Sequence, residues 1–336
     1  MTPRPDNEPV APTAPQSRRW RRIRRIAVTI LILGVVLCVG VGSYAFNSVI
    51  ARKPPLSNNP PADAPLVART MAADRRAGET LLRSTPHEQW TLDAADGTKL
   101  VGYYIPAPGA SKRTVILLHG HRANATMMAP YARLFLADGF NVFMPDNRGH
   151  GASGGGYVGM GKLDAADATG WARRIAARDG PQSQIVLLGI SMGGATVATM
   201  AGRSDLPPQV VAGIDDCGFT SISDEIGYHL GKMYLPATPI LAVVRAETGL
   251  FAGYDITGDA PIDAVRRSRI PLMFIHGAAD NYNPTWMGRA MYAAAAQPKS
   301  LWIVPGADHG LSYHTDPQGY AQRIRAFYAP YLNDRP

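Results

Sequence analysis

Ser191 stands in a run whose residue types and spacing suit nucleophilic chemistry. It is the centre of Gly189-Ile190-Ser191-Met192-Gly193, a G-x-S-x-G pattern. The apolar stretch QIVLLG precedes it, and the helix-like stretch GATVATMAG follows. A serine on a sharp turn between strand and helix needs small neighbours, and the start of the helix favours negative charge. We therefore predict that Ser191 is a nucleophile. The alternative is a glycine-rich turn that only packs a helix on a strand.

Two later loops carry side chains that could activate this serine. His309 lies in PGADHG, after the apolar run 299–304, and Asp280 lies in HGAAD, after the apolar run 271–276. We predict that His309 is the general base and that Asp280 fixes its tautomer and stabilises the imidazolium. Asp280 could instead cap a helix that starts near residue 284. Asp216, at the end of another apolar run, is the second candidate for the acid.

The elements that must position these residues alternate along the chain. Short apolar runs, separated by stretches of helical length such as 163–178, fit strands of a parallel sheet covered by helices. Asp96-Gly97 is a two-residue hairpin signal between the first two runs. In such a sheet, ligands bind at the carboxyl ends of the strands. The candidate residues each come just after a predicted strand. The predicted strands are 89–94, 99–105, 114–119, 140–145, 184–189, 210–215, 271–276 and 301–304.

Several segments together resemble the α/β-hydrolase superfamily. They are LLHGHRAN, PDNRGHGASGG, GISMGG, HGAADNYNP and PGADHG, in this order along the chain. The stretch from CGFTS to the HGAAD loop is similar to bacterial membrane-anchored hydrolases related to the S9 prolyl-oligopeptidase-like group. This resemblance spans about residues 89–331 and implies an α/β-hydrolase fold with a mostly parallel eight-stranded sheet. Asn283 departs from the pattern, since relatives usually have Val before the Pro.

An oxyanion hole is expected beside the serine. In this fold one backbone N–H follows the nucleophile and the other comes from the loop after an earlier strand. We assign these to Met192 and His121. The pair His119 and His121 also suggests a metal site, but Ala123 and Asn124 stand where further ligands are needed. The sequence therefore predicts no metal and no cofactor.

The N-terminal part predicts a membrane anchor. Residues 1–25 read as a disordered basic cytoplasmic tail, ending in the cluster RRWRRIRR. Residues 26–46 carry no charge and have about the 20 residues that a spanning helix needs. Basic residues stay on the cytoplasmic side, so the catalytic domain is expected outside the cytoplasm. Secretion after signal cleavage near Ser43-Tyr44-Ala45 is the alternative. Residues 47–65 are expected to be a linker.

Charge and cysteine content narrow the choice of function. The net charge is +8, but residues 1–53 hold nine of the 34 Lys and Arg and only two of the 26 acidic residues. The remainder is nearly neutral, which disfavours a nucleic-acid partner. The two cysteines, Cys38 and Cys217, cannot form a disulfide framework.

The hydrolase domain is expected over residues 66–334, with an insertion at 219–259. This insertion either forms a lid over the pocket or packs against the core without covering the pocket. We predict a serine hydrolase that cleaves a small-molecule or lipid-like carboxylic ester through an acyl-enzyme. A peptidase, a thioesterase, a transacylase and a catalytically silent binding module are the alternatives. The sequence makes no prediction of the oligomeric state.

Overall fold

Eight strands form one twisted sheet at the centre of the molecule. The computed structural model describes residues 16–332. The sheet order is β1-β2-β4-β3-β5-β6-β7-β8; β1–β2 and β2–β4 pair antiparallel, and the other neighbours pair parallel. The eight predicted strands are confirmed to within two residues. Their bounds are β1 Glu88–Asp93, β2 Lys99–Ile105, β3 Arg113–Leu118, β4 Asn141–Asp146, β5 Gln184–Ile190, β6 Val210–Asp216, β7 Leu272–Gly277 and β8 Lys299–Val304.

The hairpin between β1 and β2 closes where the sequence places its turn. Asp93 pairs with Lys99, and Gly97 has a φ of 77°, a left-handed conformation that favours glycine. The central strands β3 to β7 are buried almost throughout. This burial explains why they read as continuous apolar runs rather than as an alternating pattern.

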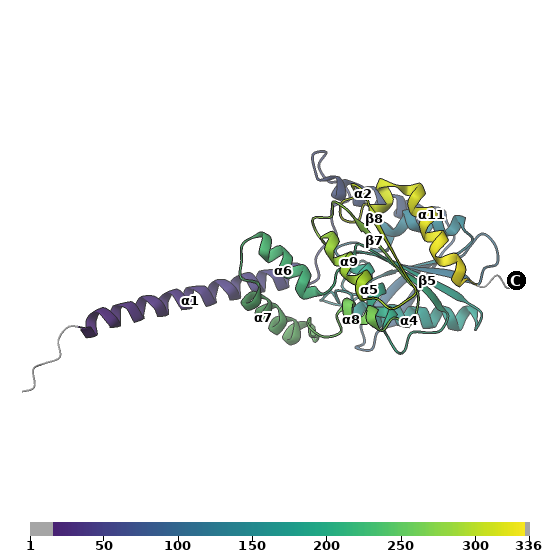
Figure 1. Cartoon of the computed structure of the whole chain (residues 1–336). Helices are drawn as coiled ribbons and strands as arrows, with labels where there is room; N and C mark the ends of the chain where they lie inside the picture. The colour runs from purple at the N-terminus through teal and green to yellow at the C-terminus, as the bar shows by residue number, and fades with distance from the viewer. Residues whose placement is uncertain (1–15, 333–336) are drawn as a thin grey trace, which may run out of the picture.

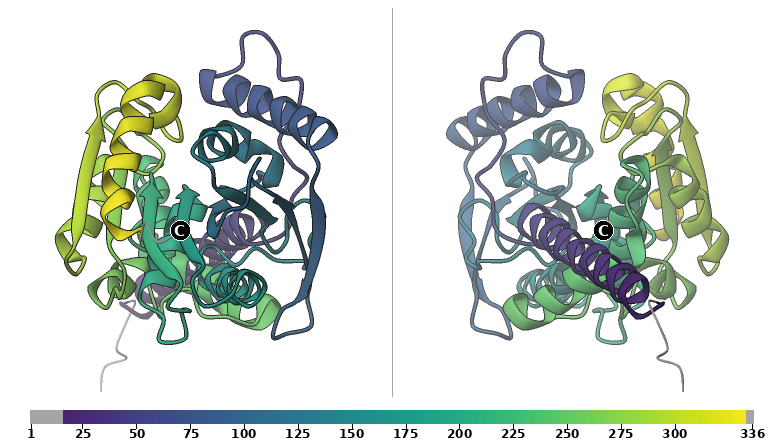
Figure 2. Two further views of the ribbon diagram at one scale, coloured as in Figure 1. Left: turned by 90° about the vertical axis from the view of Figure 1, so that its right-hand side faces the viewer. Right: turned by 90° about the vertical axis from the view of Figure 1, so that its left-hand side faces the viewer.

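Helices cover both faces of the sheet (Figure 2). One core lies under α2, α3 and α11, and a second lies under α4, α5, α8 and α9. This layered arrangement is the expected α/β-hydrolase architecture. The bounds of these and the shorter helices are α2 Leu66–Ser84, η1 Ala125–Met128, α3 Ala129–Ala137, α4 Lys162–Asp179, α5 Met192–Ala201, α8 Pro261–Arg266, α9 Thr285–Ala294, α10 Ser312–Thr315, α11 Pro317–Tyr328 and η3 Ala329–Tyr331.

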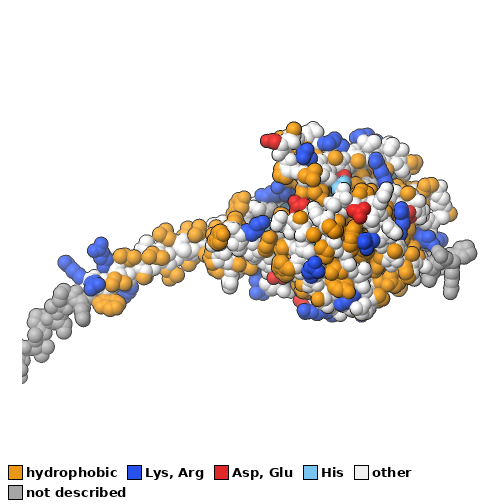
Figure 3. All heavy atoms as spheres, turned by 45° about the horizontal axis from the view of Figure 1, so that its top comes forward, with side chains coloured by type: hydrophobic (Ala, Val, Ile, Leu, Met, Phe, Trp, Pro, Cys, Tyr) orange, Lys and Arg blue, Asp and Glu red, His pale blue; other side chains and the backbone are white. Residues whose placement is uncertain are grey.

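A long N-terminal helix, α1 (Gln16–Val49), projects away from the domain (Figure 1). Its stretch Arg18–Val49 is long and apolar enough to cross a membrane. The expectation of a disordered tail over residues 1–25 is wrong for residues 16–25, because the basic cluster continues the helix. Residues 1–15 lie outside the described residues. Figure 3 shows apolar side chains along the helix and basic side chains near its outer end.

The segment expected to be a linker is bound to the domain. The helix α1 continues through Val49, and the Arg52 guanidinium then donates to the backbone oxygens of Ser153 (2.8 Å) and Gly151 (2.9 Å). The backbone N–H of Arg52 donates to Gly156 O at 2.8 Å. These bonds fix the inner end of α1 to the domain.

The insertion at 219–259 forms a helical hairpin beside α1. It contains α6 (Ile222–Lys232), α7 (Ala237–Glu247) and η2 (Thr248–Ala252), a single π-helical turn. A third apolar core joins these helices to the end of α1 and to Met192. Within the hairpin it is α7 that packs along α1, and α6 packs on α7.

Candidate active site

Ser191 occupies the turn between β5 and α5 in a conformation that few side chains adopt. Its φ is 57° and its ψ is −118°. A Cβ atom on Gly193 would lie 2.0 Å from Leu118 O, and one on Gly189 would lie 2.0 Å from Gly193 O. Both glycines are needed because the start of α5 lies against strand backbone. The turn therefore lifts Ser191 above the sheet with local backbone strain, as functional residues often require.

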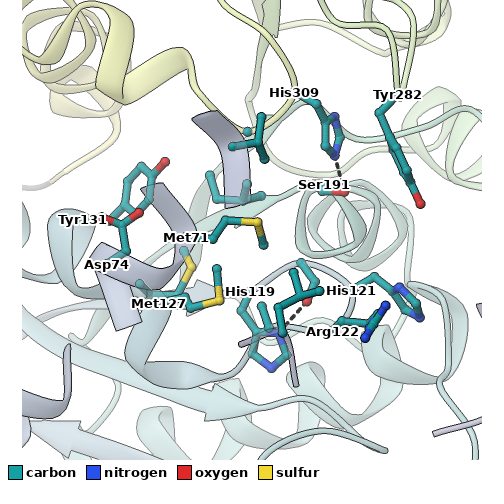
Figure 4. A pocket seen from close by; sticks show the side chains of 17 residues that line it. Met71, Asp74, His119, His121, Arg122, Met127, Tyr131, Ser191, Tyr282 and His309 are labelled. Carbon is teal, nitrogen blue, oxygen red and sulfur yellow. Dashed lines mark hydrogen bonds between the residues drawn. The ribbon is translucent and has the colours of Figure 1, made fainter. Parts of the chain in front are cut away.

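The structure brings Ser191, His309 and Asp280 into one chain of hydrogen bonds. His309 Nε2 lies 2.9 Å from Ser191 Oγ, and His309 Nδ1 lies 2.8 Å from Asp280 Oδ2. Figure 4 shows the His309 ring above the serine hydroxyl. His309 lies in the loop after β8 and Asp280 in the loop after β7, both at the carboxyl end of the sheet. This arrangement has the geometry required of a base and its orienting acid.

The Asp280 carboxylate is buried and well supplied with donors. Its Oδ1 accepts the backbone N–H groups of Tyr282 and Asn283, each at 2.9 Å. Burial by itself raises the pKa of Asp280, but hydrogen bonds from His276 and His309 outweigh it and lower the pKa to about 2. The carboxylate is therefore ionised at neutral pH and can hold the proton on Nδ1 of His309.

His276 is a member of this site that sequence reasoning missed. Its Nε2 lies 3.4 Å from Asp280 Oδ2 and 2.8 Å from Asn283 O. Asn283, the departure from the family pattern, also donates from Nδ2 to Cys217 O at 2.9 Å. These contacts fix the loop that carries Asp280. His276 lies near the end of β7, where several other strands also carry polar residues, so no sequence signal distinguished it.

Asp216, the second candidate for the acid, lies apart from this chain of hydrogen bonds. It accepts a hydrogen bond from Ser312 Oγ at 2.8 Å. Burial raises the pKa of Asp216 to about 6. Among the described residues no hydrogen bond joins Asp216 to His309. The geometry thus places Asp280, rather than Asp216, beside the imidazole.

The two residues assigned to the oxyanion hole flank the serine. Met192 is the first residue of α5, where backbone N–H groups have no acceptor within the helix. The loop that holds His121 approaches closely, since a Cβ on Gly120 would lie 3.4 Å from Ser191 Cβ. A close approach of this kind is what a second backbone donor needs. The roles of Met192 and His121 stay predictions.

Buried histidines hold this loop in place. His119 Nε2 accepts the backbone N–H of Asn147 at 3.0 Å, and His150 Nε2 accepts the backbone N–H of Arg122 at 3.0 Å. Burial lowers the pKa of His119 to about 4 and that of His150 to about 3, so both rings are neutral. These bonds tie the segment 146–151 to the loop that carries His121.

One group of described side chains is close enough to chelate an ion, and it coincides with the candidate acid and base. Cys217, Asp280 and His309 offer ligand atoms within 4.8 Å of one another. Burial raises the pKa of the Cys217 thiol well above its usual range, and neighbouring Asp216 and Asp280 raise it further. The protonated thiol is a poor metal ligand, because metals bind thiolate.

A mostly apolar cavity of about 290 Å³ opens beside Ser191. Met71 and Met127 project into it, and Asp74 and Tyr131 lie on the side opposite Ser191 (Figure 4). Asp74 Oδ2 is 2.9 Å from His314 Nε2. The cavity is lined by Leu56, Val67, Met71, Asp74, His119, Gly120, His121, Arg122, Ala123, Met127, Met128, Tyr131, Ile190, Ser191, Tyr282, His309 and Gly310.

The insertion at 219–259, for which the sequence left a lid and a packing role open, does not line the cavity in the described part of the chain. The wall of the cavity instead includes residues of α2 and of the segment before it. The insertion approaches the rim of the cavity through His229, whose ring centroid is 4.6 Å from that of Tyr282, and through Lys232, whose Nζ donates to Asn281 O at 3.2 Å. The packing of α7 along α1 favours a packing role for the insertion over a lid.

Comparison with known proteins shows the family. The chain is 30% identical over 252 residues to the uncharacterized protein YfhR of Escherichia coli strain K12, covering 73% of this chain and 82% of that protein. It is 29% identical over 241 residues to the uncharacterized protein YqkD of Bacillus subtilis, covering 71% and 78%. The model of a family described as serine aminopeptidase, S33, matches residues 109–226.

The fold has close structural neighbours as well. An esterase of Pyrococcus furiosus, Pf2001, superposes with a TM-score of 0.60 at 20% identity, covering 74% of this chain and 94% of that chain. The chain belongs to the α/β-hydrolase superfamily and is a hydrolase of the serine type. A closer relationship to the S9 group stays a prediction.

Proposed function

We propose that this chain is a serine carboxylesterase that works through an acyl-enzyme on Ser191. The hydrogen-bonded chain from Ser191 through His309 to Asp280 carries the proposal. His309 takes the Ser191 proton as the hydroxyl oxygen attacks the ester carbonyl carbon. The negative charge that forms on the carbonyl oxygen is held by the N–H groups of Met192 and His121.

Collapse of this tetrahedral intermediate completes the first half of the reaction. The carbon–oxygen bond to the alcohol breaks, and His309 returns its proton to the departing alkoxide oxygen. Water then attacks the acyl-enzyme with His309 again as the base, which releases the acid and restores Ser191. Asp280 stays ionised and stabilises the imidazolium in both halves, consistent with its low pKa.

The apolar cavity favours an ester with an apolar acyl or alcohol part. Met71, Met127 and Met128 line it, and methionine side chains adapt to flexible chains. A cavity of about 290 Å³ is near the lower end of the range for small-molecule sites. We therefore infer that the substrate is an ester with a short to medium apolar chain.

A larger side chain at position 71 tests this assignment. Met71→Trp is expected to lower kcat/KM for p-nitrophenyl octanoate at least about tenfold relative to the acetate, since one to two methylenes of lost burial are worth about that factor. The matched control Met71→Leu conserves volume and is expected to keep the wild-type preference. The measurement is kcat/KM across a series of chain lengths. An unchanged preference in folded Met71→Trp would place the acyl chain elsewhere.

Other acyl-transfer reactions use the same groups. A peptidase is the alternative that the description of the matching family favours. Rates on p-nitrophenyl esters compared with aminoacyl p-nitroanilides separate the two, because an amide needs a protonated leaving group far more than a p-nitrophenolate does. Hydrolysis of the anilides with kcat/KM equal to that of the esters would favour the peptidase.

We also infer that α1 anchors the protein in a membrane with the catalytic domain outside the cytoplasm. The basic side chains near the outer end of α1 and the charge-free run at 26–46 support this orientation. A reporter fused after the C-terminus of the full chain is expected to be active only if it is a periplasmic or extracellular type. A fusion active only as a cytoplasmic reporter would reverse the orientation. Release of the fusion into the medium would indicate cleavage near Ala45 instead.

A further inference from the structure

The hairpin of α6 and α7 runs along α1 at the level where α1 is expected to lie in lipid. A Cβ on Gly42 of α1 would lie 2.5 Å from Val243 Cβ and 3.2 Å from Ile240 O. One turn further toward the domain, the rings of Phe46 and Phe251 are 5.8 Å apart. The Ser43 hydroxyl donates to the Glu247 carboxylate between these two points.

These contacts set the direction of the hairpin. Residue numbers on α7 and η2 rise in the same direction as those on α1, so α7 runs parallel to α1 and toward the domain. The connection between α6 and α7, which precedes α7, therefore points away from the domain. Figure 1 shows α6 and α7 on either side of the inner half of α1, with their connection toward its outer end. Cys38 and Val41 of α1 pack against the same core as Leu235 and Ala237.

The length of α1 then constrains the depth of the hairpin. Residues 26–46 form a helical stretch of about 31 Å at a rise of 1.5 Å per residue, which matches a hydrocarbon core of about 30 Å. Residues 26–37 are exposed, but they span only about 18 Å. Contact with the hairpin begins at Cys38. If α1 crosses the bilayer, its residues from Cys38 to Phe46 lie within the hydrocarbon core, and α7 lies beside them there.

The hairpin has the composition that such a position needs. Residues 233–244, MYLPATPILAVV, carry no charge, and Lys232 and Arg245 stand at the two ends of this run. Met233 is 56% exposed and Tyr234 is 97% exposed at the connection. Arg245 bonds Asp255 at the domain end of α7 (2.8 Å), and Lys232 donates to Asn281 O at 3.2 Å, so both charges are held toward the domain. Tyrosine favours the membrane interface.

We propose that the α6–α7 hairpin enters the leaflet on the side of the catalytic domain, with Met233 and Tyr234 in contact with lipid. The proposal rests on the proposed membrane span of α1. The partner that covers the exposed side chains of Met233 and Tyr234 is therefore the lipid bilayer. The insertion acts as a second membrane contact that fixes the hydrolase domain, with its cavity, against the bilayer surface.

Depth-dependent quenching of a fluorescent label tests the proposal in the full-length chain. Single cysteines at Val36, Tyr234 and Gln182 are introduced into a Cys38→Ser background and labelled with an NBD dye, while buried Cys217 stays unreactive. Val36 lies on exposed α1, and Gln182 lies before β5, at the end of the sheet opposite Ser191. Each protein is placed in bilayers with or without brominated acyl chains. Hydrolysis of a p-nitrophenyl ester verifies that each is folded.

The labels at positions 36 and 234 are expected to emit at shorter wavelength and to lose at least about half of their emission in brominated bilayers, whereas the label at 182 is not quenched. Quenching at 36 but not at 234 would overturn the hairpin proposal and leave the anchor intact. A shorter emission wavelength at 234 without quenching would also overturn it, because protein rather than lipid would then cover the site. Quenching at neither position would overturn the anchor together with the hairpin proposal.

A pair of glycine variants tests the link between the hairpin and α1. Gly42→Ile places a branched side chain against α7 and is expected to abolish or strongly reduce quenching of the label at 234 while leaving that at 36. Gly40→Ile is the control, since a Cβ there meets nothing within 4 Å. Equal quenching at 234 in both variants would show that the hairpin position does not depend on α1.

Discussion

Asp280→Asn is expected to lower kcat for a p-nitrophenyl ester on the order of 10⁴-fold. The carboxylate accepts the Nδ1 proton of His309 at 2.8 Å and is ionised at neutral pH. The asparagine amide cannot supply the negative charge that stabilises the imidazolium. Its NH₂ group can also donate to Nδ1, which leaves the proton on Nε2 and prevents that atom from accepting the serine proton. The measurement is kcat in protein shown by circular dichroism to be folded.

Asp216→Asn is the matched control for this change. Asp216 is also a buried aspartate at the end of a strand, but it bonds Ser312 instead of His309. We expect its replacement to change kcat less than about tenfold and to act mainly on the free energy of unfolding. A larger loss of kcat in folded Asp216→Asn than in Asp280→Asn would move the acid to Asp216.

The strands and the serine turn could be predicted because their sequence signals are local. A strand of a covered parallel sheet is apolar on both faces, so the buried runs are visible in sequence without knowledge of their neighbours. At the Ser191 turn the G-x-S-x-G pattern is visible within five residues, although the close approach that Gly193 permits is to Leu118 O of β3. The order of the three candidate residues along the chain then follows from the fold.

The wall of the cavity could not be predicted in this way. Met71 and Asp74 lie on α2, more than 100 residues before Ser191, and their position depends on how α2 packs on η1 and α3. The contact of His276 with Asp280 could not be predicted either, because it depends on the path of the loop after β7. The pairing of α7 with α1 joins segments 200 residues apart. Side-chain packing at such separations leaves no periodic signal in the sequence.

Ser191→Ala is expected to have the largest effect of any single change. Loss of the hydroxyl removes the atom that forms the acyl-enzyme, and in serine hydrolases this costs on the order of 10⁶-fold in kcat. The folded structure is expected to persist because alanine is smaller and Ser191 Oγ contacts mainly His309. Ser204→Ala, an exposed serine away from the cavity, is the control and is expected to keep wild-type kcat. Steady-state hydrolysis of p-nitrophenyl butyrate measures both.

The most direct test of the central claim is to map the covalent adduct formed by a fluorophosphonate. Wild-type protein is treated with the reagent, digested and analysed by mass spectrometry, with Ser191→Ala and His309→Ala treated in parallel. We expect one adduct, on Ser191, absent from Ser191→Ala and strongly reduced in His309→Ala because the serine then lacks its base. An adduct on another residue, or full ester hydrolysis by purified Ser191→Ala, would contradict the assignment of Ser191 as the nucleophile.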